Sequence, residues 1–137
     1  MTDKVVDAPT VVALLFNELT QEKIVARLRG ASLHAPALLE FEAANACLKK
    51  MRASPGERQM LLEAFSLLNA LSIAPERIDL AEAIALAERT KLSFYDASCL
   101  WLAFALDAEL VTLDDKLARA DKALRRASER GSGHRPA

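Results

Sequence analysis

The sequence predicts an α/β domain in which helices cover both faces of a parallel sheet. Short apolar runs of strand length alternate with longer stretches of helical pattern, as in consecutive βαβ units. Acidic residues follow the first and the last of these runs, at the end of a parallel sheet where ligands bind. The length of 137 residues and the hydrophobic content of 52% suit a single domain with a substantial core.

The first strand is expected over residues 4–6, Lys-Val-Val, and it ends at Asp7. Pro9 follows, and proline fits the first turn of a helix because the N–H that it lacks has no partner there. The apolar pattern then predicts a helix as far as residue 19, and residues 21–29 predict a second, amphipathic helix. This order of strand, acid and helix is typical of a parallel sheet.

The second strand is expected over residues 32–35, and a helix over residues 37–52. The helical repeat of this segment predicts one inward face, formed by Leu38, Phe41, Asn45 and Leu48. Glu42 lies beside this face, three residues before Asn45, so we expect both polar groups at the edge of the core. A Ser-Pro-Gly-Glu sequence then predicts the start of a further helix, which reaches about residue 71 and completes a helical hairpin.

The third strand is weakly indicated at residues 73–74, and a helix follows over residues 80–90. The central helix begins with the pattern Ser93-x-x-Asp96, which is typical of a capping box. Residues 97–106 carry no charge, and a helix that is apolar on every side is normally buried. The sequence therefore predicts a core helix with a single carboxylate in its first turn.

The last expected strand covers residues 110–112 and is followed shortly by Asp114. A polar helix is predicted over residues 116–126. We assign residues 1–127 to the domain and expect residues 128–137 to form a disordered tail, because chain ends rich in glycine and polar residues are rarely tied down.

The charge of the chain is unevenly distributed. From residue 116 onward seven Lys or Arg residues stand against two acids, so this end carries +5 and residues 1–115 carry −6 within a net charge of −1. We interpret the basic end as a solvated helix and tail in preference to a nucleic-acid patch. The overall balance lacks the strongly basic footprint of a general nucleic-acid binder.

The cysteine usage and the apolar runs indicate the compartment. Cys47 and Cys99 lie in apolar helical patterns and show neither a disulfide framework nor the spacing of a zinc site, which favours a reducing environment. The first residues lack the layout of a signal peptide, and no apolar run approaches the roughly 20 residues that span a bilayer. We expect a cytoplasmic protein with no membrane segment.

Four carboxylates occupy comparable places in the predicted fold. Asp7 and Asp114 follow strands. Asp96 begins the buried helix, and Glu42 flanks the inward face of another. Each has an ordinary explanation when taken alone, because the three aspartates could cap helices and the glutamate could be solvated.

Taken together, the four acids favour a metal site. Two like charges about 4 Å apart repel by about 4 kcal/mol at an effective dielectric of about 20. No Lys or Arg is adjacent in sequence to Asp7, Glu42 or Asp96, and only Lys116 lies close to Asp114. A cation would remove the repulsion, and a site built from oxygen ligands suits Mg²⁺ or Mn²⁺.

The motifs Asp-Ala, Glu-x-x-Asn, Tyr-Asp-Ala and Val-Thr-x-Asp occur in this order within residues 5–18 (VVDAPTVVALLFNE), 35–50 (APALLEFEAANACLKK) and 92–117 (LSFYDASCLWLAFALDAELVTLDDKL). With them the chain resembles the PIN-domain ribonucleases, in particular the VapC toxins of bacterial toxin–antitoxin pairs. The resemblance implies a three-layer α/β/α domain with a four- or five-stranded parallel sheet and a protruding helical hairpin.

The resemblance also implies an activity, namely cleavage of single-stranded RNA with Mg²⁺ or Mn²⁺. The family's four catalytic and metal-binding acids fall on Asp7, Glu42, Asp96 and Asp114. Its supporting polar residues fall on Asn45 and Thr112. A homodimer is implied, and so is a cognate antitoxin whose C-terminal segment lies in the groove beside the helical hairpin.

Two features differ from the family pattern. Many members carry Ser or Thr two residues after the first acid, where this chain has Pro9 and then Thr10. The Thr10 hydroxyl could contact a carboxylate or a phosphate, or make a local backbone bond. The family often ends with a further strand, which the last residues here do not resemble.

Several alternatives stay open. Glu40 and Asp115 are neighbours that could replace the second and fourth acids. A receiver-like domain that accepts phosphate would also use an acidic pocket with Mg²⁺, although no Asp ends the third predicted strand. A PIN-like module without catalysis would act by binding alone.

Overall fold

The computed structural model describes residues 1–16, 18 and 20–132. The elements in chain order are β1 (Thr2–Val6), α1 (Ala8–Leu15), α2 (Gln21–Leu28), β2 (Ala31–Pro36), α3 (Leu39–Ala53), η1 (Pro55–Glu57), α4 (Arg58–Ser66), η2 (Leu67–Leu71), β3 (Ala74–Glu76), α5 (Leu80–Thr90), α6 (Phe94–Ala105), β4 (Glu109–Val111) and α7 (Asp115–Ser132). The first helix is shorter than predicted. Phe16 is the C-cap of α1, and its N–H donates to the Val12 carbonyl. The predicted continuation at residues 17 and 19 lies outside the described residues.

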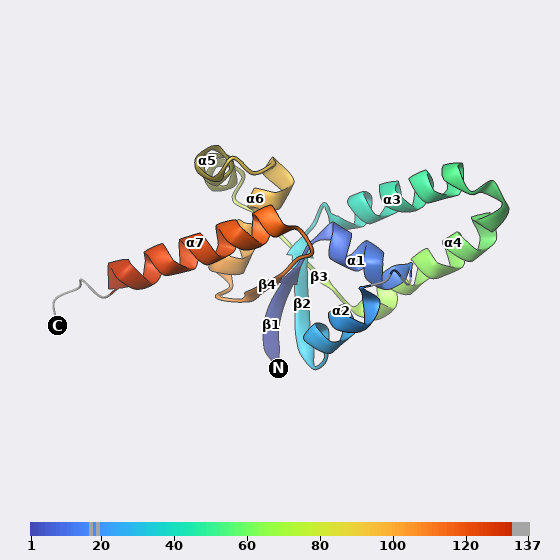
Figure 1. Ribbon diagram of the computed structural model, residues 1–137, viewed down its shortest axis with the longest axis horizontal. Helices are drawn as coiled ribbons and strands as arrows, with labels where there is room; N and C mark the ends of the chain where they lie inside the picture. The colour runs from blue at the N-terminus through green and yellow to red at the C-terminus, as the bar shows by residue number, and fades with distance from the viewer. Residues whose placement is uncertain (17, 19, 133–137) are drawn as a thin grey trace.

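The four strands pair in parallel in the order β3-β2-β1-β4 (Figure 1). Val5 of β1 lies opposite His34 of β2 on one side and opposite Leu110 of β4 on the other. The predicted α/β fold with a parallel sheet is thus confirmed. Because every strand runs in the same direction, the carboxyl ends of all four meet along one edge.

Helices cover both faces of the sheet, which gives three layers. Val5 and Leu110 face a core built with α5, α6 and the start of α7. The alternate residues Val6 and Val111 face a second core, built with α1, α2 and α3. Figure 1 shows these two groups of helices on opposite sides of the strands.

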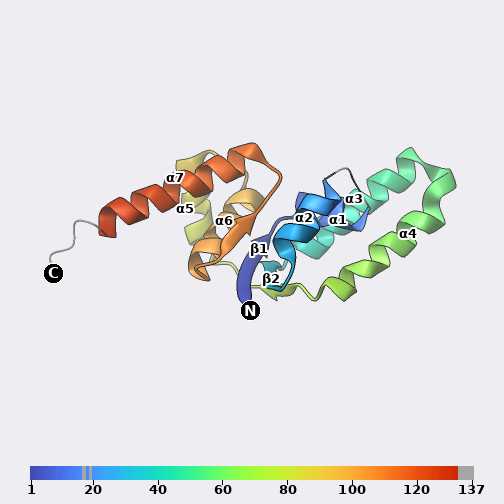
Figure 2. The ribbon, with the colours of Figure 1, turned by 60° about the horizontal axis from the view of Figure 1, so that its bottom comes forward.

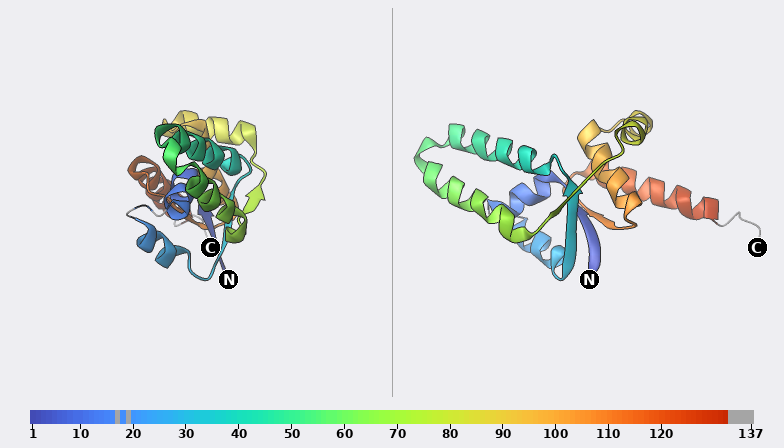
Figure 3. Two further views of the ribbon diagram at one scale, coloured as in Figure 1. Left: turned by 90° about the vertical axis from the view of Figure 1, so that its right-hand side faces the viewer. Right: turned by 180° about the vertical axis from the view of Figure 1, so that it is seen from behind.

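The helices α3 and α4 form a hairpin that extends away from the sheet, as expected (Figures 2 and 3). The predicted inward face of α3 is wrong. Phe41 is 73% exposed, and Leu38, Asn45 and Leu48 are also exposed. The buried residues are instead Leu39, Ala43 and Cys47. The helix carries apolar residues on both sides, and the side with the small residues packs because α1 lies against it.

The last helix is longer than predicted. It continues for six residues past the expected end at residue 126, so residues 128–132 are helical and not part of a disordered tail. The rest of the predicted tail, residues 133–137, lies outside the described residues. Although α7 has 18 residues, it is strongly charged. Within residues 1–16, 18 and 20–132, neither it nor any other helix is both long and apolar enough to cross a membrane.

Candidate active site

The topology of the sheet singles out one place along its carboxyl edge. From β1 the chain passes through β2 to β3, and it then crosses back to the far side of β1 through α5 and α6. The crevice between the carboxyl ends of β1 and β4 is therefore the switch point of the topology, where open α/β sheets bind ligands. Asp7 follows β1 at this crevice, and Thr112 follows β4.

Asp7 is completely buried at the start of α1, where it is the helix cap. One carboxylate oxygen accepts hydrogen bonds from the Thr10 N–H at 3.1 Å and the Thr10 hydroxyl at 2.5 Å. The other accepts a hydrogen bond from the Thr112 hydroxyl at 2.5 Å. Neutral donors therefore hold this buried carboxylate, and no ion pair of the described residues involves it. Both threonines singled out in the sequence thus orient the first acid.

Thr112 also connects Asp7 to Asp114. Its hydroxyl accepts a hydrogen bond from the Asp114 N–H at 3.0 Å while it donates to Asp7. The Asp114 carboxylate accepts a hydrogen bond from the Leu117 N–H at 2.8 Å, so Asp114 caps α7. The helix-cap explanation considered from the sequence is therefore correct for this residue. The Asp114 side chain is exposed, so capping does not remove it from the mouth of the crevice.

Asp96 lies in the first turn of α6, and its N–H donates to the Ser93 hydroxyl at 3.1 Å, as the capping-box pattern predicts. Burial raises the pKa of Asp96, and the negative charges of Asp114 and Asp7 raise it further. The Ser93 hydrogen bond and the charge of Lys116 act in the opposite direction without cancelling the rise. Asp114 and Asp7 therefore both lie close enough to Asp96 for their charges to disfavour its ionised form.

Glu42 reaches the site from α3. It lines a cavity of about 400 Å³ together with Asp96 and Asn45, between α1, α3 and the start of α6. Within the described part of the chain, neither Glu42 nor Asn45 makes a side-chain hydrogen bond. The structure thus brings Glu42 to the same cavity as Asp96, and Asn45 does not orient a carboxylate here.

Two residues of this cavity were not predicted from the sequence. Lys49 lies one further turn along the face of α3 that presents Glu42 and Asn45, and it is the one cation among the described residues that line the cavity. The seven-residue spacing from Glu42 to Lys49 could have identified it. Tyr95 also lines the cavity, and burial raises the pKa of its phenol far above the usual range, so the hydroxyl stays protonated at neutral pH.

The donor set suits a hard divalent cation, although the side chains do not form a closed site. In the part of the chain that the structure describes, no three His, Cys, Asp or Glu side chains stand close enough to enclose an ion. The acids at the crevice nevertheless offer only oxygen ligands, and their mutual repulsion is not cancelled by a basic partner. Mg²⁺ commonly binds through one or two carboxylates and keeps several waters, so this arrangement fits such an ion.

The comparison with family models decides the class of this fold and site. The model of the PIN domain matches residues 4–123, a range that includes Asp7, Glu42, Asp96 and Asp114. The chain belongs to the PIN-domain family. PIN domains are generally nucleases, and those nucleases generally depend on a divalent metal ion.

A solved structure agrees with this assignment. The PIN domain described here is similar to the crystal structure of PAE2754 from Pyrobaculum aerophilum, with a TM-score of 0.72 and 25% sequence identity. The match covers 88% of this chain and 86% of that chain, so it extends over almost the whole of both. Among curated proteins, no match was found.

Proposed function

We propose that this PIN domain is a metal-dependent endoribonuclease and acts as a VapC-type toxin of a toxin–antitoxin pair. The observation that carries the proposal is the group of acids at the switch point. Asp7 is buried without a cationic partner among the described residues, and the pKa of Asp96 is raised first by burial and then by the negative charges of Asp114 and Asp7. Such clustering is unfavourable in the free protein and becomes favourable once a divalent cation is bound.

Each acid has a role in the proposed site. Asp7, Asp96 and Asp114 would hold Mg²⁺ or Mn²⁺ directly or through water, and Glu42 would join them from the cavity wall. A divalent ion bound there supplies Lewis-acid stabilisation of the phosphate and lowers the pKa of a bound water. Thr10 and Thr112 fix the orientation of Asp7 through the hydrogen bonds that they donate.

The reaction would be hydrolysis of a phosphodiester bond. The oxygen of a water molecule forms a bond to phosphorus, the ester bond to the leaving ribose oxygen breaks, and that oxygen takes up a proton. Lys49 lines the cavity from α3, whereas Asp96 lines it from α6, and Lys49 can bind a non-bridging phosphate oxygen. Its charge would offset part of the repulsion between the acids and the RNA backbone.

The proposed partners fit the exposed apolar surface. Phe41, Met60 and Leu67 of the helical hairpin are 73%, 58% and 56% exposed, and exposed apolar groups on one element often mark a protein interface. A pocket lined by Leu39, Leu68 and Ile73 opens at the base of the hairpin. A cognate antitoxin would bind with its C-terminal segment beside this hairpin, and a second copy of the chain would complete a homodimer.

An RNA cleavage assay tests the activity. The wild-type chain should cut an end-labelled single-stranded RNA with Mg²⁺ or Mn²⁺, and EDTA should stop the cleavage. Asp96→Asn should abolish cleavage and keep the fold, because the substitution removes one of the repelling charges. Glu57→Gln at the tip of the hairpin is the matched control and should cut at the wild-type rate.

The same assay separates the proposal from its alternatives. Cleavage by folded Asp96→Asn at the wild-type rate would exclude the proposed site. A wild-type chain that binds RNA without cutting it under any metal condition would be the non-catalytic binding module. The receiver-like alternative is disfavoured because the chain belongs to the PIN family and β3 ends at Glu76, with no aspartate acceptor.

A further inference from the structure

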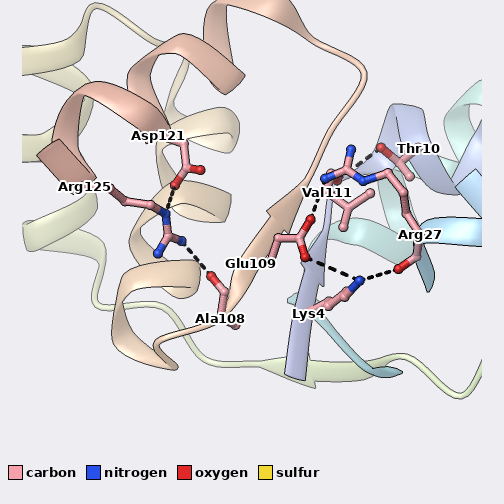
Figure 4. A network of polar contacts seen from close by, with 8 residues as sticks. All are labelled: Lys4, Thr10, Arg27, Ala108, Glu109, Val111, Asp121 and Arg125. Carbon is pink, nitrogen blue, oxygen red and sulfur yellow. Dashed lines mark hydrogen bonds and ion pairs between the residues drawn. The ribbon is translucent and has the colours of Figure 1, made fainter. Parts of the chain in front are cut away.

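The helix α7 has two contrasting faces. On its inner face Leu117 is completely buried, and Leu124 packs against the core around α6. Arg125 also belongs to this side, because it donates to Asp121 at 2.9 Å and to the Ala108 carbonyl at 2.7 Å (Figure 4). Its guanidinium carbon lies 4.9 Å from the centre of the Phe104 ring. The inner face therefore anchors the helix to the domain.

The opposite face carries what we call the outer basic stripe: Arg119, Lys122, Arg126 and Arg130. Their spacing of three, four and four residues places the four side chains along one line of the helix. All four are exposed, and within the described residues none of the four side chains takes part in an ion pair or hydrogen bond. The acids nearest to this line are Asp115 at its start and Glu129 at its margin.

The outer basic stripe begins at the candidate active site. Asp114 caps α7, so the first turn of the helix lies at the mouth of the crevice. From there the helix extends about 27 Å, at about 1.5 Å for each of its 18 residues. Figures 1 and 3 show it leaving the domain on the side away from the α3–α4 hairpin. The stripe therefore forms a path of positive charge from the acids outward.

The uneven charge of the chain indicates what the outer basic stripe binds. Residues 1–115 carry −6, and a polyanion such as RNA is repelled by an acidic body and attracted by a row of unpaired cations. A helix that served only solubility would not need to collect its cations on one line beginning at the acids. The contrast with Arg125, which is fully engaged with the domain, indicates that the four stripe residues are available for an external partner.

We infer that the outer basic stripe binds the sugar–phosphate backbone of single-stranded RNA next to the bond that is cut. This inference rests on the proposed nuclease function and adds the path of the substrate to it. The contacts are to phosphates, so the stripe contributes affinity and register without reading the base sequence. RNA that reaches α7 gains this affinity, and RNA too short to reach it does not.

The test compares two variants, each with three charges neutralised. Arg119→Gln, Lys122→Gln and Arg126→Gln together remove most of the stripe. Lys23→Gln, Arg52→Gln and Arg58→Gln remove three exposed cations of α2 and the hairpin and serve as the matched control. Both sets are placed in the Asp96→Asn background, so that bound RNA stays intact. Fluorescence anisotropy then measures binding of a labelled single-stranded RNA of about 20 nucleotides between about 50 and 200 mM salt, and circular dichroism checks folding.

The stripe variant should bind roughly tenfold more weakly than the control at the lower salt concentration, and the slope of log K against log salt should fall by about 2. When the three stripe substitutions are made in a chain that keeps Asp96, the rate of cleavage should fall more for the long RNA than for a tetranucleotide. Equal affinities and slopes for the two variants would overturn the inference. The stripe would then be assigned to binding an acidic protein surface. Failure of the proposed function is a separate result, namely a native chain that binds RNA and does not cut it.

Discussion

At the scale of single residues, the site depends on how Asp7 is held. A buried carboxylate is costly unless hydrogen bonds or opposite charges satisfy it. Here two threonine hydroxyls and one backbone N–H do so, from positions on α1 and directly after β4. Because Thr112 also accepts from the Asp114 N–H, it links two acids that are more than 100 residues apart in sequence. The threonine is therefore a positioning residue for the whole group.

We expect Thr112→Val to destabilise the chain by about 1–3 kcal/mol, because one oxygen of the buried Asp7 carboxylate loses its donor. Cleavage of RNA should fall at the same time. Thr112→Ser keeps the hydroxyl and should retain most of the stability and activity. Urea unfolding together with the cleavage assay measures both effects, and equal behaviour of the Val and Ser variants would refute the positioning role.

A second residue-scale feature connects three strands. His34 of β2 contacts Asp3 of β1 at 2.9 Å and Glu76 of β3 at 3.0 Å, one through each ring nitrogen. Burial alone would lower the pKa of His34, but the hydrogen bonds and charges of Glu76 and Asp3 outweigh burial and raise it. The protonated ring can donate to both carboxylates, so the imidazolium form is the one that the fold favours.

This arrangement predicts a dependence of stability on pH. Because the folded-state pKa of His34 lies above its unfolded value of about 6.5, the stabilisation is complete below that value and is lost as pH rises through the folded-state pKa. The difference in unfolding free energy between the wild type and His34→Gln should therefore be larger at about pH 6 than at about pH 8.5. Urea titrations at the two pH values measure it, and a larger difference at the higher pH would contradict the assigned sign.

At the scale of elements, α3 shows where a periodic pattern is ambiguous. The helical repeat of its large apolar residues predicted one inward face, but the buried residues are Leu39, Ala43 and Cys47 on another face. Close approach of α1 requires small side chains, and a pattern of hydrophobicity does not reveal which neighbour will approach. With Leu39, Ala43 and Cys47 facing inward, Glu42, Asn45 and Lys49 line the cavity beside Asp96.

Two substitutions on α3 test this orientation. Ala43 is completely buried, so Ala43→Leu should overpack the contact with its neighbours and cost about 1–3 kcal/mol. Phe41 is mostly exposed, so Phe41→Ser should change the unfolding free energy of the isolated chain by no more than about 0.5 kcal/mol. Urea unfolding of both variants is the measurement. A large loss of unfolding free energy for Phe41→Ser, with a small loss for Ala43→Leu, would contradict this orientation and support the inward face predicted from the sequence.

At the scale of the whole molecule, the features predicted correctly were those encoded locally. The strand that ends at Asp7, the capped helix that begins near Asp96 and the strand before Thr112 each have a short signature, and parallel pairing brings their ends to one edge. Features that depend on distant partners were missed. The packing of α7 on the domain is an example, because Arg125 donates to the Ala108 carbonyl, which lies before β4.

The position of the acids within the domain also explains why a long basic helix is useful. The switch point collects negative charge, and α7 carries positive charge outward from it. The oligomeric state and the antitoxin remain predictions from the family resemblance. Exposed apolar residues on the hairpin are consistent with either partner, since such surface is usually covered in the assembled state.

The most direct test of the central claim is a calorimetric titration of the folded chain with Mn²⁺. We predict saturable binding to the wild type, unchanged binding to Glu57→Gln, and at least tenfold weaker binding to Asp96→Asn. A loss of about tenfold in metal affinity already follows when a residue that only hydrogen-bonds to a metal ligand is removed. If the wild type bound no Mn²⁺, or if Asp96→Asn bound it as tightly as the wild type, the acids at the end of the sheet would not form a metal site.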